Sequence, residues 1–300
     1  MHARELSLKD PEDRVDATII PFVLMHVAAV VGPILVGFEV KWVLYTFGIY
    51  VVGMFGITAG FHRYFAHRAF KTSRAFQLVL ALLGTITVQK GVLWWASHHR
   101  IHHRYSDTDK DIHSPVRKGF WWAHVGWFVN RRYDETEWDK IRDFAKYPEL
   151  VWLNKYFLVV QTAVAIAWLV FAGLPGLVWG FFVGTVVLWH GTFTINSLTH
   201  LFGTRRYETT DDSRNHWFFA LITLGEGWHN NHHYYQSTAN QGFFWWELDV
   251  SYYMLKVLSV FGIVWDLRNP PRWVLETRAA DAEANGSPEA ANPVDVRRAA

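Results

Sequence analysis

The sequence predicts an all-α integral membrane protein, and three observations support this fold class. Of its 300 residues, 51% are hydrophobic, 17 are Trp and only 19% are charged, whereas soluble domains carry about 25% charged residues. Four segments are apolar and long enough to cross a bilayer, which takes about 20 residues. Nine of the sixteen histidines cluster beside these segments.

The predicted spans are residues 17–38, 42–61, 156–172 and 177–197. Only the tripeptide EVK separates the first two spans, and the turn signal GLPG separates the last two, so they predict two helical hairpins. The apolar run 75–88 is too short to span and is expected to be buried or interfacial. Residues 1–16 form a predicted cytosolic segment, 17–275 the membrane domain, and 276–300 a disordered tail.

Basic residues predict the orientation of the spans. The two hairpin turns carry one Lys or Arg, Lys41, whereas residues 63–146 carry fifteen. Because Lys and Arg are retained on the cytoplasmic side, we expect a multi-pass protein whose termini and histidine-bearing segments are all cytoplasmic.

Composition also excludes several classes of site and partner. A net charge of +2 without a basic recognition module argues against a nucleic-acid partner. The chain has no cysteine, which excludes disulfides, iron–sulfur clusters and zinc–thiolate sites.

The histidine clusters predict a di-metal site. Residues i, i+3 and i+4 share a helix face, so each H-x-x-H-H box is expected to aim three imidazoles in one direction. His62 and His67 lie about 140° apart on an ideal helix and are expected to serve different ions or to mark a helix end. Nine ligands exceed the needs of one ion and fit two ions with four or five nitrogens each. The predicted ligands are His62, His67, His99, His102, His103, His200, His229, His232 and His233.

The other histidines and the identity of the metal are less determined. We expect His26, His190 and His216 to be satisfied polar residues, and leave His98, His113 and His124 open. Only "EGWH", at residues 226–229, has the carboxylate–histidine spacing of di-iron bundle proteins, so the ligand set is almost all nitrogen. The spacing alone does not choose iron over zinc.

Over residues 21–269 the sequence resembles the membrane fatty-acyl desaturases, the stearoyl-CoA (delta-9) desaturase family. The resemblance rests on "GITAGFHRYFAH", "HRIHHRYSDTDKDIHSP", "GFWWAHVGWF", "INSLTH" and "GEGWHNNHHYY". It implies four transmembrane helices with a cytosolic helical cap, and two irons held by the nine histidines, with Asn196 reaching one iron through a water. It also implies an O₂-dependent oxidoreductase that introduces a cis double bond, at delta-9, into a saturated acyl chain.

The same resemblance implies a bent acyl tunnel. Gln89, Trp95 and Thr192 match the residues that set its bend, and Tyr50 and Met54 match those that close its end. Met54 stands where animal enzymes have a small residue. This difference predicts a shorter preferred acyl chain.

The acyl carrier and the electron donor are expectations too. Ser97 and His98 replace an Arg-Asp pair that helps animal enzymes bind coenzyme A, so acyl-CoA is the expected substrate but an acyl-carrier protein or a glycerolipid stays open. Besides membrane lipid, we expect a separate ferredoxin-, cytochrome b5- or reductase-type partner to supply electrons.

Two other functions fit parts of the pattern. A fatty-acyl or alkyl hydroxylase of the same fold would give an alcohol instead of an alkene. A membrane metal-binding or transport protein would place its ligands near the bilayer midplane, whereas these boxes lie at the cytoplasmic ends of the predicted spans. Bound zinc without O₂ consumption would favour that class.

Overall fold

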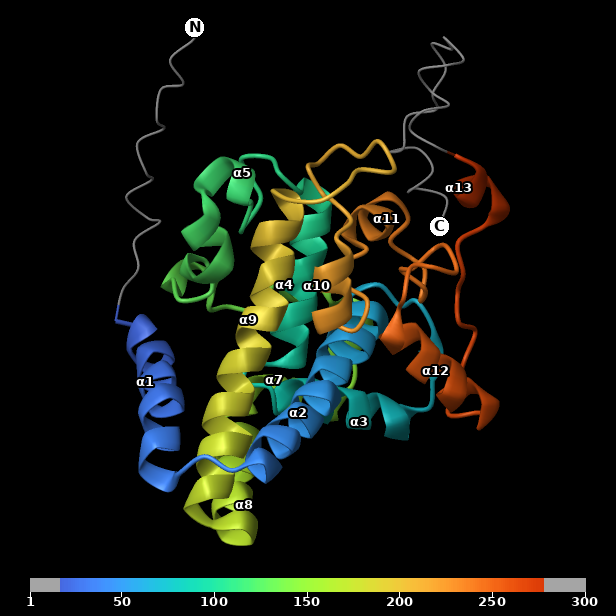
Figure 1. Cartoon of the computed structure of the whole chain (residues 1–300). Helices are drawn as coiled ribbons and strands as arrows, with labels where there is room; N and C mark the ends of the chain where they lie inside the picture. The colour runs from blue at the N-terminus through green and yellow to red at the C-terminus, as the bar shows by residue number, and fades with distance from the viewer. Residues whose placement is uncertain (1–16, 278–300) are drawn as a thin grey trace, which may run out of the picture.

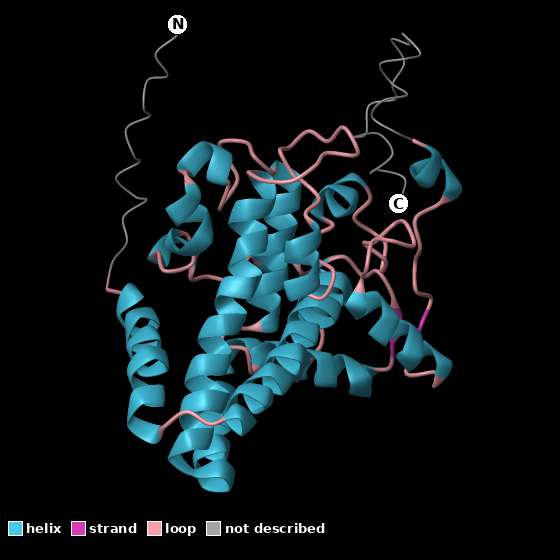
Figure 2. Cartoon of the chain, viewed as in Figure 1, coloured by secondary structure: helices cyan, strands magenta, loops and turns pink. Residues whose placement is uncertain are grey.

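The computed structural model describes residues 17–277. The predicted N-terminal segment 1–16, and the predicted tail beyond residue 277, lie outside the described residues. The described part is mostly helical (Figures 1 and 2), and one short antiparallel ladder pairs β1 (Lys71–Thr72) with β2 (Val264–Trp265).

Three helical segments of the described part are long and apolar enough to cross a membrane. The first is α1 (Ile19–Val36), and the second joins α2 (Val40–Phe55) to the π-helix η1 (Gly56–Ala66). The third runs from Phe157 to His200 through α8 (Phe157–Gly176), η5 (Leu177–Val183), α9 (Gly184–Ser197) and η6 (Leu198–His200). The backbone leaves helical geometry at Gly173, with φ 66° and ψ −166°, inside the predicted GLPG turn, and η5 packs against α8.

Shorter helices build the rest of the molecule, and Figure 1 shows α5, α11 and α13 at the end opposite α8. In chain order they are α3 (Arg74–Thr85), α4 (Val92–Tyr105), α5 (Pro115–Lys118), η2 (Trp122–Gly126), η3 (Arg131–Tyr133), η4 (Trp138–Lys140), α6 (Arg142–Ala145), α7 (Pro148–Lys155), α10 (Trp217–Ile222), α11 (His229–Tyr234), α12 (Val250–Val260) and α13 (Arg272–Glu276).

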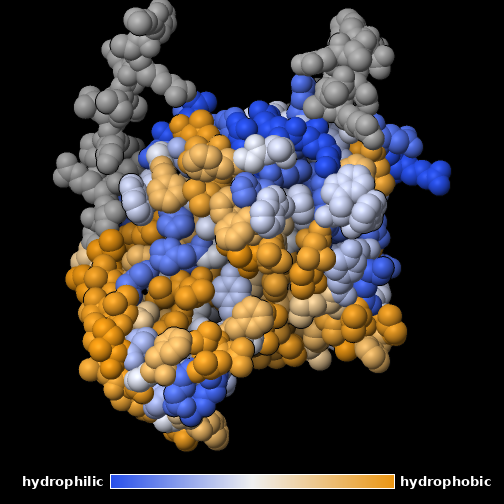
Figure 3. All heavy atoms as spheres, viewed as in Figure 1, coloured by the Kyte–Doolittle hydropathy of each residue, from blue (hydrophilic) through white to orange (hydrophobic). Residues whose placement is uncertain are grey.

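Large apolar side chains cover the outside of the long helices. Ile34 of α1 is 77% exposed and Phe171 of α8 is 86% exposed. Figure 3 shows hydrophobic residues over the lower part of the molecule and hydrophilic residues at the opposite end. Exposed apolar area of this extent is unusual in soluble monomers and fits a lipid-facing surface.

Glycines let the π-helix η1 approach α3 closely. A Cβ atom on Gly56 would lie 2.5 Å from the Leu83 carbonyl oxygen, and one on Gly84 would lie 2.2 Å from the Phe61 ring. The inner face of α3 is fully buried at Leu80 and Ala81. This contact fixes the end of the second long segment, where His62 lies.

Candidate metal centre

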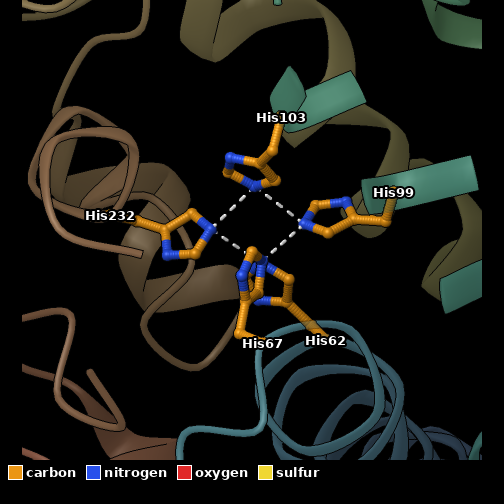
Figure 4. Close-up of side chains that lie close together, drawn as sticks. All are labelled: His62, His67, His99, His103 and His232. Atoms are coloured by element: carbon orange, nitrogen blue, oxygen red, sulfur yellow. Dashed lines mark hydrogen bonds between the residues drawn. The ribbon is translucent and has the colours of Figure 1, made fainter. Parts of the chain in front are cut away.

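The nine predicted ligands come together in two groups. In each group the nitrogen atoms that could hold a metal ion all lie within 4.8 Å of one another. The five-histidine group, shown in Figure 4, contains His62, His67, His99, His103 and His232. The four-histidine group contains His102, His200, His229 and His233.

The two H-x-x-H-H boxes are divided between the groups, which corrects the expectation that each box points in one direction. On α4, His99 and His103 join the five-histidine group, whereas His102 joins the other. On α11 the division is reversed: His232 joins the five-histidine group, whereas His229 and His233 join the four-histidine group. Positions i+3 and i+4 differ by about 100° around a helix, so one helix can serve two neighbouring ions.

The π-helix explains why His62 and His67 join the same group. The His67 backbone N–H donates to the His62 carbonyl oxygen at 3.1 Å, an i→i+5 bond that an ideal α-helix lacks. Their ring centroids are 4.8 Å apart. The pair therefore lies where the helix ends, as one of the two expectations stated. The other expectation, that His62 and His67 bind different ions, is wrong, because both belong to one group.

The Nε2 atoms of the five-histidine group face one another. The Nε2–Nε2 separations are 3.0 Å for His62–His232, 3.0 Å for His67–His99, 2.9 Å for His99–His103 and 3.0 Å for His103–His232. In the four-histidine group the Nε2 atoms of His200 and His229 are 3.0 Å apart. A common metal ion is the usual reason for several imidazole nitrogens to converge in this way.

Four carboxylates hold the outer nitrogens of these rings. The Nδ1 atom lies 2.6 Å from Glu226 in His62, 3.0 Å from Asp111 in His102, 2.8 Å from Asp107 in His200 and 2.7 Å from Asp211 in His233. A proton on Nδ1 leaves the Nε2 lone pair directed at the centre, as in carboxylate–histidine–metal triads. Sequence reasoning noted Glu226 only through the "EGWH" spacing and missed the three aspartates, although the acidic run "SDTDKD", which begins three residues after His103, was an available signal for Asp107 and Asp111.

Burial keeps most of the centre in its metal-binding protonation state. Burial, with neighbouring imidazoles, holds the pKa of His67, His99, His103, His229 and His232 well below the ordinary histidine value. Burial opposes ionisation of Asp107, but hydrogen bonds from His200, the Ser114 hydroxyl and the Asp212 backbone lower the pKa of that carboxyl to about 2. Neutral imidazoles surrounded by ionised carboxylates are the expected state of a histidine metal site.

A buried arginine supports the same region. Arg63 is 1% exposed and donates to Glu226 at 3.0 Å and 3.1 Å and to Asp249 at 2.9 Å. Glu226 thus accepts from Arg63 while it holds His62. Glu226 of the "EGWH" sequence therefore does not pair with His229 but contacts the outer nitrogen of His62, a predicted ligand on η1.

A narrow cavity adjoins the five-histidine group. Its volume is about 70 Å³, and its lining includes Gln89, Trp95, His99, Thr192 and Asn196. Trp95 donates through its indole nitrogen to Gln89 at 3.4 Å, and the Gln89 amide donates to Thr192 at 3.2 Å. The structure brings the three predicted bend residues together beside a predicted ligand. The water-mediated role of Asn196 stays a prediction.

The two predicted end residues lie beyond this cavity's lining. Tyr50 donates its hydroxyl to the Ile222 carbonyl at 2.6 Å, and Met54 is 1% exposed in the main hydrophobic core. A Cβ atom on Gly191 would lie 2.5 Å from the Tyr50 hydroxyl and 3.0 Å from the Met54 methyl. Both side chains therefore contact α9 one residue before Thr192, and their role as an end wall stays a prediction.

Similarity to known proteins identifies the family of this chain. A family model described as fatty acid desaturase matches residues 41–258. The chain belongs to the fatty acid desaturase family. It is 39% identical over 220 residues to the sn-1 stearoyl-lipid 9-desaturase of Anabaena variabilis, covering 73% of this chain and 80% of that protein. It is 37% identical to the sn-1 stearoyl-lipid 9-desaturase of Synechocystis sp. over 86% and 81% of the two chains, and 35% identical to an acyl-CoA C20 Delta5-desaturase of Anemone leveillei over 82% and 79%.

This membership makes the protein an oxidoreductase that acts as a fatty-acyl desaturase. The histidine groups of this desaturase fit a pair of metal ions on structural grounds. In the described part, the buried Nε2 atom of His233 has no hydrogen-bond partner, although the other nitrogen of the ring is held by Asp211. An ion in the four-histidine group would use that lone pair.

The two positions that differ from the coenzyme-A-binding pair are buried in this desaturase. Ser97 is fully buried and His98 is 2% exposed. The Ser97 hydroxyl donates to the Trp94 carbonyl at 2.9 Å, and the Nδ1 atom of His98 lies 2.9 Å from the same oxygen. These side chains are therefore engaged with the backbone of α4, and neither is presented to an acyl headgroup.

Proposed function

We propose that this desaturase uses two iron ions and O₂ to introduce a cis double bond at carbon 9 of a saturated fatty-acyl chain. The observation that carries the proposal is the shared position of His99, which belongs to the five-histidine group and also lines the narrow cavity. An acyl carbon in that cavity would lie next to the metal centre. The names of two relatives specify 9-desaturases, which supports the position.

The chain's own residues would hold the metals and place the substrate. The five- and four-histidine groups would supply nine imidazole nitrogens for two ions, with Asn196 reaching one ion through a water. Bound iron would supply the O₂-dependent oxidation that removes two hydrogens from unactivated methylenes, which acid–base side chains do not achieve. Gln89, Trp95 and Thr192 would fix the bend of the acyl chain.

Trp95 connects the bend to the metal centre. Its ring stacks on His99 with centroids 5.0 Å apart and a 21° interplanar angle, and it lies 6.2 Å from the His62 ring. The Trp95–Gln89–Thr192 hydrogen bonds connect the Trp95 ring to α9. A displacement of the bend would thus also displace a ring packed on two ligands.

We infer four membrane crossings in two hairpins, with both termini and the metal centre cytoplasmic. The segment from Phe157 to His200 has 44 residues, roughly 66 Å of helix at 1.5 Å per residue, whereas a bilayer core is about 30 Å thick. The non-helical backbone at Gly173 divides it into a shorter stretch of roughly 24 Å and a longer one of roughly 40 Å, one for each proposed crossing. The Lys and Arg asymmetry supports the orientation.

The acyl carrier and the electron donor belong to the same proposal. Acyl-CoA is the carrier we propose; relatives' names specify both lipid-linked and CoA-linked acyl chains, and glycerolipid or acyl-carrier substrates are the alternatives to assay. A separate electron-transfer protein would reduce the irons. A cavity of about 1,340 Å³ reaches His67 and His103 and is lined by Arg68, Arg100 and Arg104, which suits an acidic partner.

Product analysis in a desaturase-deficient host tests the proposal. We expect the wild-type chain to give cis alkenes with the double bond at carbon 9, and His103→Ala or His232→Ala to give none, because each removes a ligand. His216→Gln is the matched control, since His216 lies outside both groups, and should stay active. An alcohol as the product, or full desaturation by either ligand variant, would overturn the proposal. Purified protein that converts only acyl chains esterified in phospholipid would overturn the acyl-CoA assignment.

A further inference from the structure

Three histidines outside the two metal groups form a continuous hydrogen-bonded chain. The Nε2 atoms of His26 on α1 and His190 on α9 are 2.9 Å apart, and His190 Nδ1 lies 3.0 Å from Nε2 of His124 on η2. The ends of the chain are the Phe22 carbonyl, 2.7 Å from His26 Nδ1, and the Ser197 hydroxyl, 2.9 Å from His124 Nδ1. The expectation that His26 and His190 are satisfied polar residues is confirmed, because each forms hydrogen bonds within this chain. The same expectation is wrong for His216, whose buried Nδ1 has no hydrogen-bond partner in the described part.

The Phe22 end of the chain fixes the direction of the hydrogen bonds between the rings. A carbonyl only accepts, so His26 Nδ1 carries a proton and, in a neutral ring, Nε2 accepts from His190. His190 then accepts from His124 through Nδ1. Burial lowers the pKa of His124 to about 4, so its ring is neutral. The single proton of the Ser197 hydroxyl is shared between His124 Nδ1, at 2.9 Å, and the Phe193 carbonyl, to which it donates at 2.8 Å. The two nitrogens of His190 face different partners, so the three rings do not converge on one ion.

The chain lies directly behind the aromatic wall of the acyl cavity. The Phe22 ring of α1 stacks on Trp189 at 5.3 Å with a 14° interplanar angle, and meets Phe128 at 5.7 Å and 67°. Trp189, Phe128 and Phe193 line the cavity, and Phe193 is 6.4 Å from Phe22. α1 therefore forms the outer layer of that wall.

Towards its other end α1 packs against η5, where Gly32 lies against Val178. Gly32 is its one buried residue, and Leu24 and Val30 are 60% and 68% exposed. Near Phe22, by contrast, Thr18 donates to the Val129 carbonyl and His26 joins the histidine chain. Between helices in lipid, polar side chains of this kind hold the partners together.

We propose that the His26–His190–His124 chain is a positioning element that holds α1 against the aromatic wall and so fixes which acyl carbon reaches the metal centre. This inference rests on the proposed function. A cavity of about 70 Å³ is small beside the roughly 300–1,000 Å³ of ordinary ligand pockets, so the wall yields when an acyl chain enters. The histidine chain then sets the position to which the wall returns.

Three substitutions separate this role from simple packing. His26→Phe keeps an aromatic ring but removes both hydrogen bonds. His26→Gln restores a donor and an acceptor near the former Nε2 position. Leu24→Phe adds a ring on the exposed face of the same helix and is the matched control. Because the chain has no cysteine, spin labels on Ile20→Cys and Trp121→Cys, at side chains 54% and 76% exposed, report the distance from α1 to the start of η2 without reference to activity.

We expect His26→Phe to broaden the spin-label distance distribution, to spread the double bond over more than one position and to raise KM roughly threefold or more, with kcat and iron content little changed. His26→Gln should restore all three readouts, and Leu24→Phe should resemble the wild type. An unchanged distance distribution in His26→Phe would show that the histidine chain does not hold α1 in place. A broadened distribution with wild-type double-bond positions and KM would show that holding α1 does not position the acyl chain. A wild-type chain that forms no alkene would instead refute the proposed function. The distance measurement would still show whether the histidine chain holds α1 in place.

Discussion

At the level of single residues, the orientation of several ligands depends on the nitrogen that faces away from the metal. Nδ1 of His102, His200 and His233 lies against an aspartate in each case. The carboxylate fixes the tautomer and ring direction and raises the basicity of the inner nitrogen. We therefore expect these aspartates to affect metal affinity although none of them touches the metal.

Asp211 offers a sharp test because its neighbour is a natural control. Asp211→Asn removes the charge next to His233 at nearly constant size, so iron should be lost to a chelator at roughly 10- to 100-fold lower chelator concentration. Asp212→Asn should behave as the wild type, because the Asp212 side chain is 41% exposed and contacts Arg205 at 3.8 Å. Equal iron retention by the two variants would contradict the role given to Asp211.

Met54 tests the proposed end of the acyl tunnel. The proposal is that its bulk, with Tyr50, favours chains of about sixteen carbons, since each methylene that loses its place in the pocket costs about 0.8 kcal/mol. Met54→Ala should raise the ratio of longer to shorter products while the double bond keeps its distance from the carboxyl end. Met254→Ala, which alters a methionine packed on the same core from α12, should leave the ratio unchanged. A wild-type ratio with Met54→Ala would remove Met54 from the tunnel end.

At the level of elements, sequence patterns predicted the ligands but not their distribution between two groups. The helical period places His62 and His67 on different faces, and the i→i+5 backbone bond that brings them together follows from the packing of η1, which a local pattern does not encode. The division of each H-x-x-H-H box depends on how α4 and α11 face each other across segments more than a hundred residues apart. For the same reason Asp211 was missed, and the partner of Glu226, His62, was not foreseen.

The close contact of η1 with α3 makes a prediction about this element. Gly56→Ala would place a methyl group 2.5 Å from the Leu83 backbone, so α3 must shift and the π-helix loses its support. We expect a lower thermal midpoint and a lower iron content in purified protein. Gly48→Ala is the control, because no atom lies within 4 Å of the added methyl and alanine favours the helix. Equal midpoints for the two variants would show that the contact is dispensable.

For the whole molecule, composition and hydropathy predicted a helical membrane protein, and the structure has three long apolar helical segments. The proposed function adds that these segments make four membrane crossings. Single cysteines at Phe38, Leu174 and Asp109, all exposed, can be labelled with an impermeant maleimide in sealed vesicles of both orientations. We expect the first two on the outer side and Asp109 on the cytoplasmic side. Labelling of Leu174 from the same side as Asp109 would exclude the second hairpin.

The division of nine histidines into two metal sites can be measured directly by counting iron in purified protein. The proposed di-iron centre predicts two irons per chain in the wild type. It predicts about one in His67→Ala, which removes a ligand from the five-histidine group, and about one in His229→Ala, which removes a ligand from the other. His216→Gln should retain two. A single iron in the wild type, or two irons retained in both ligand variants, would contradict the two-site centre.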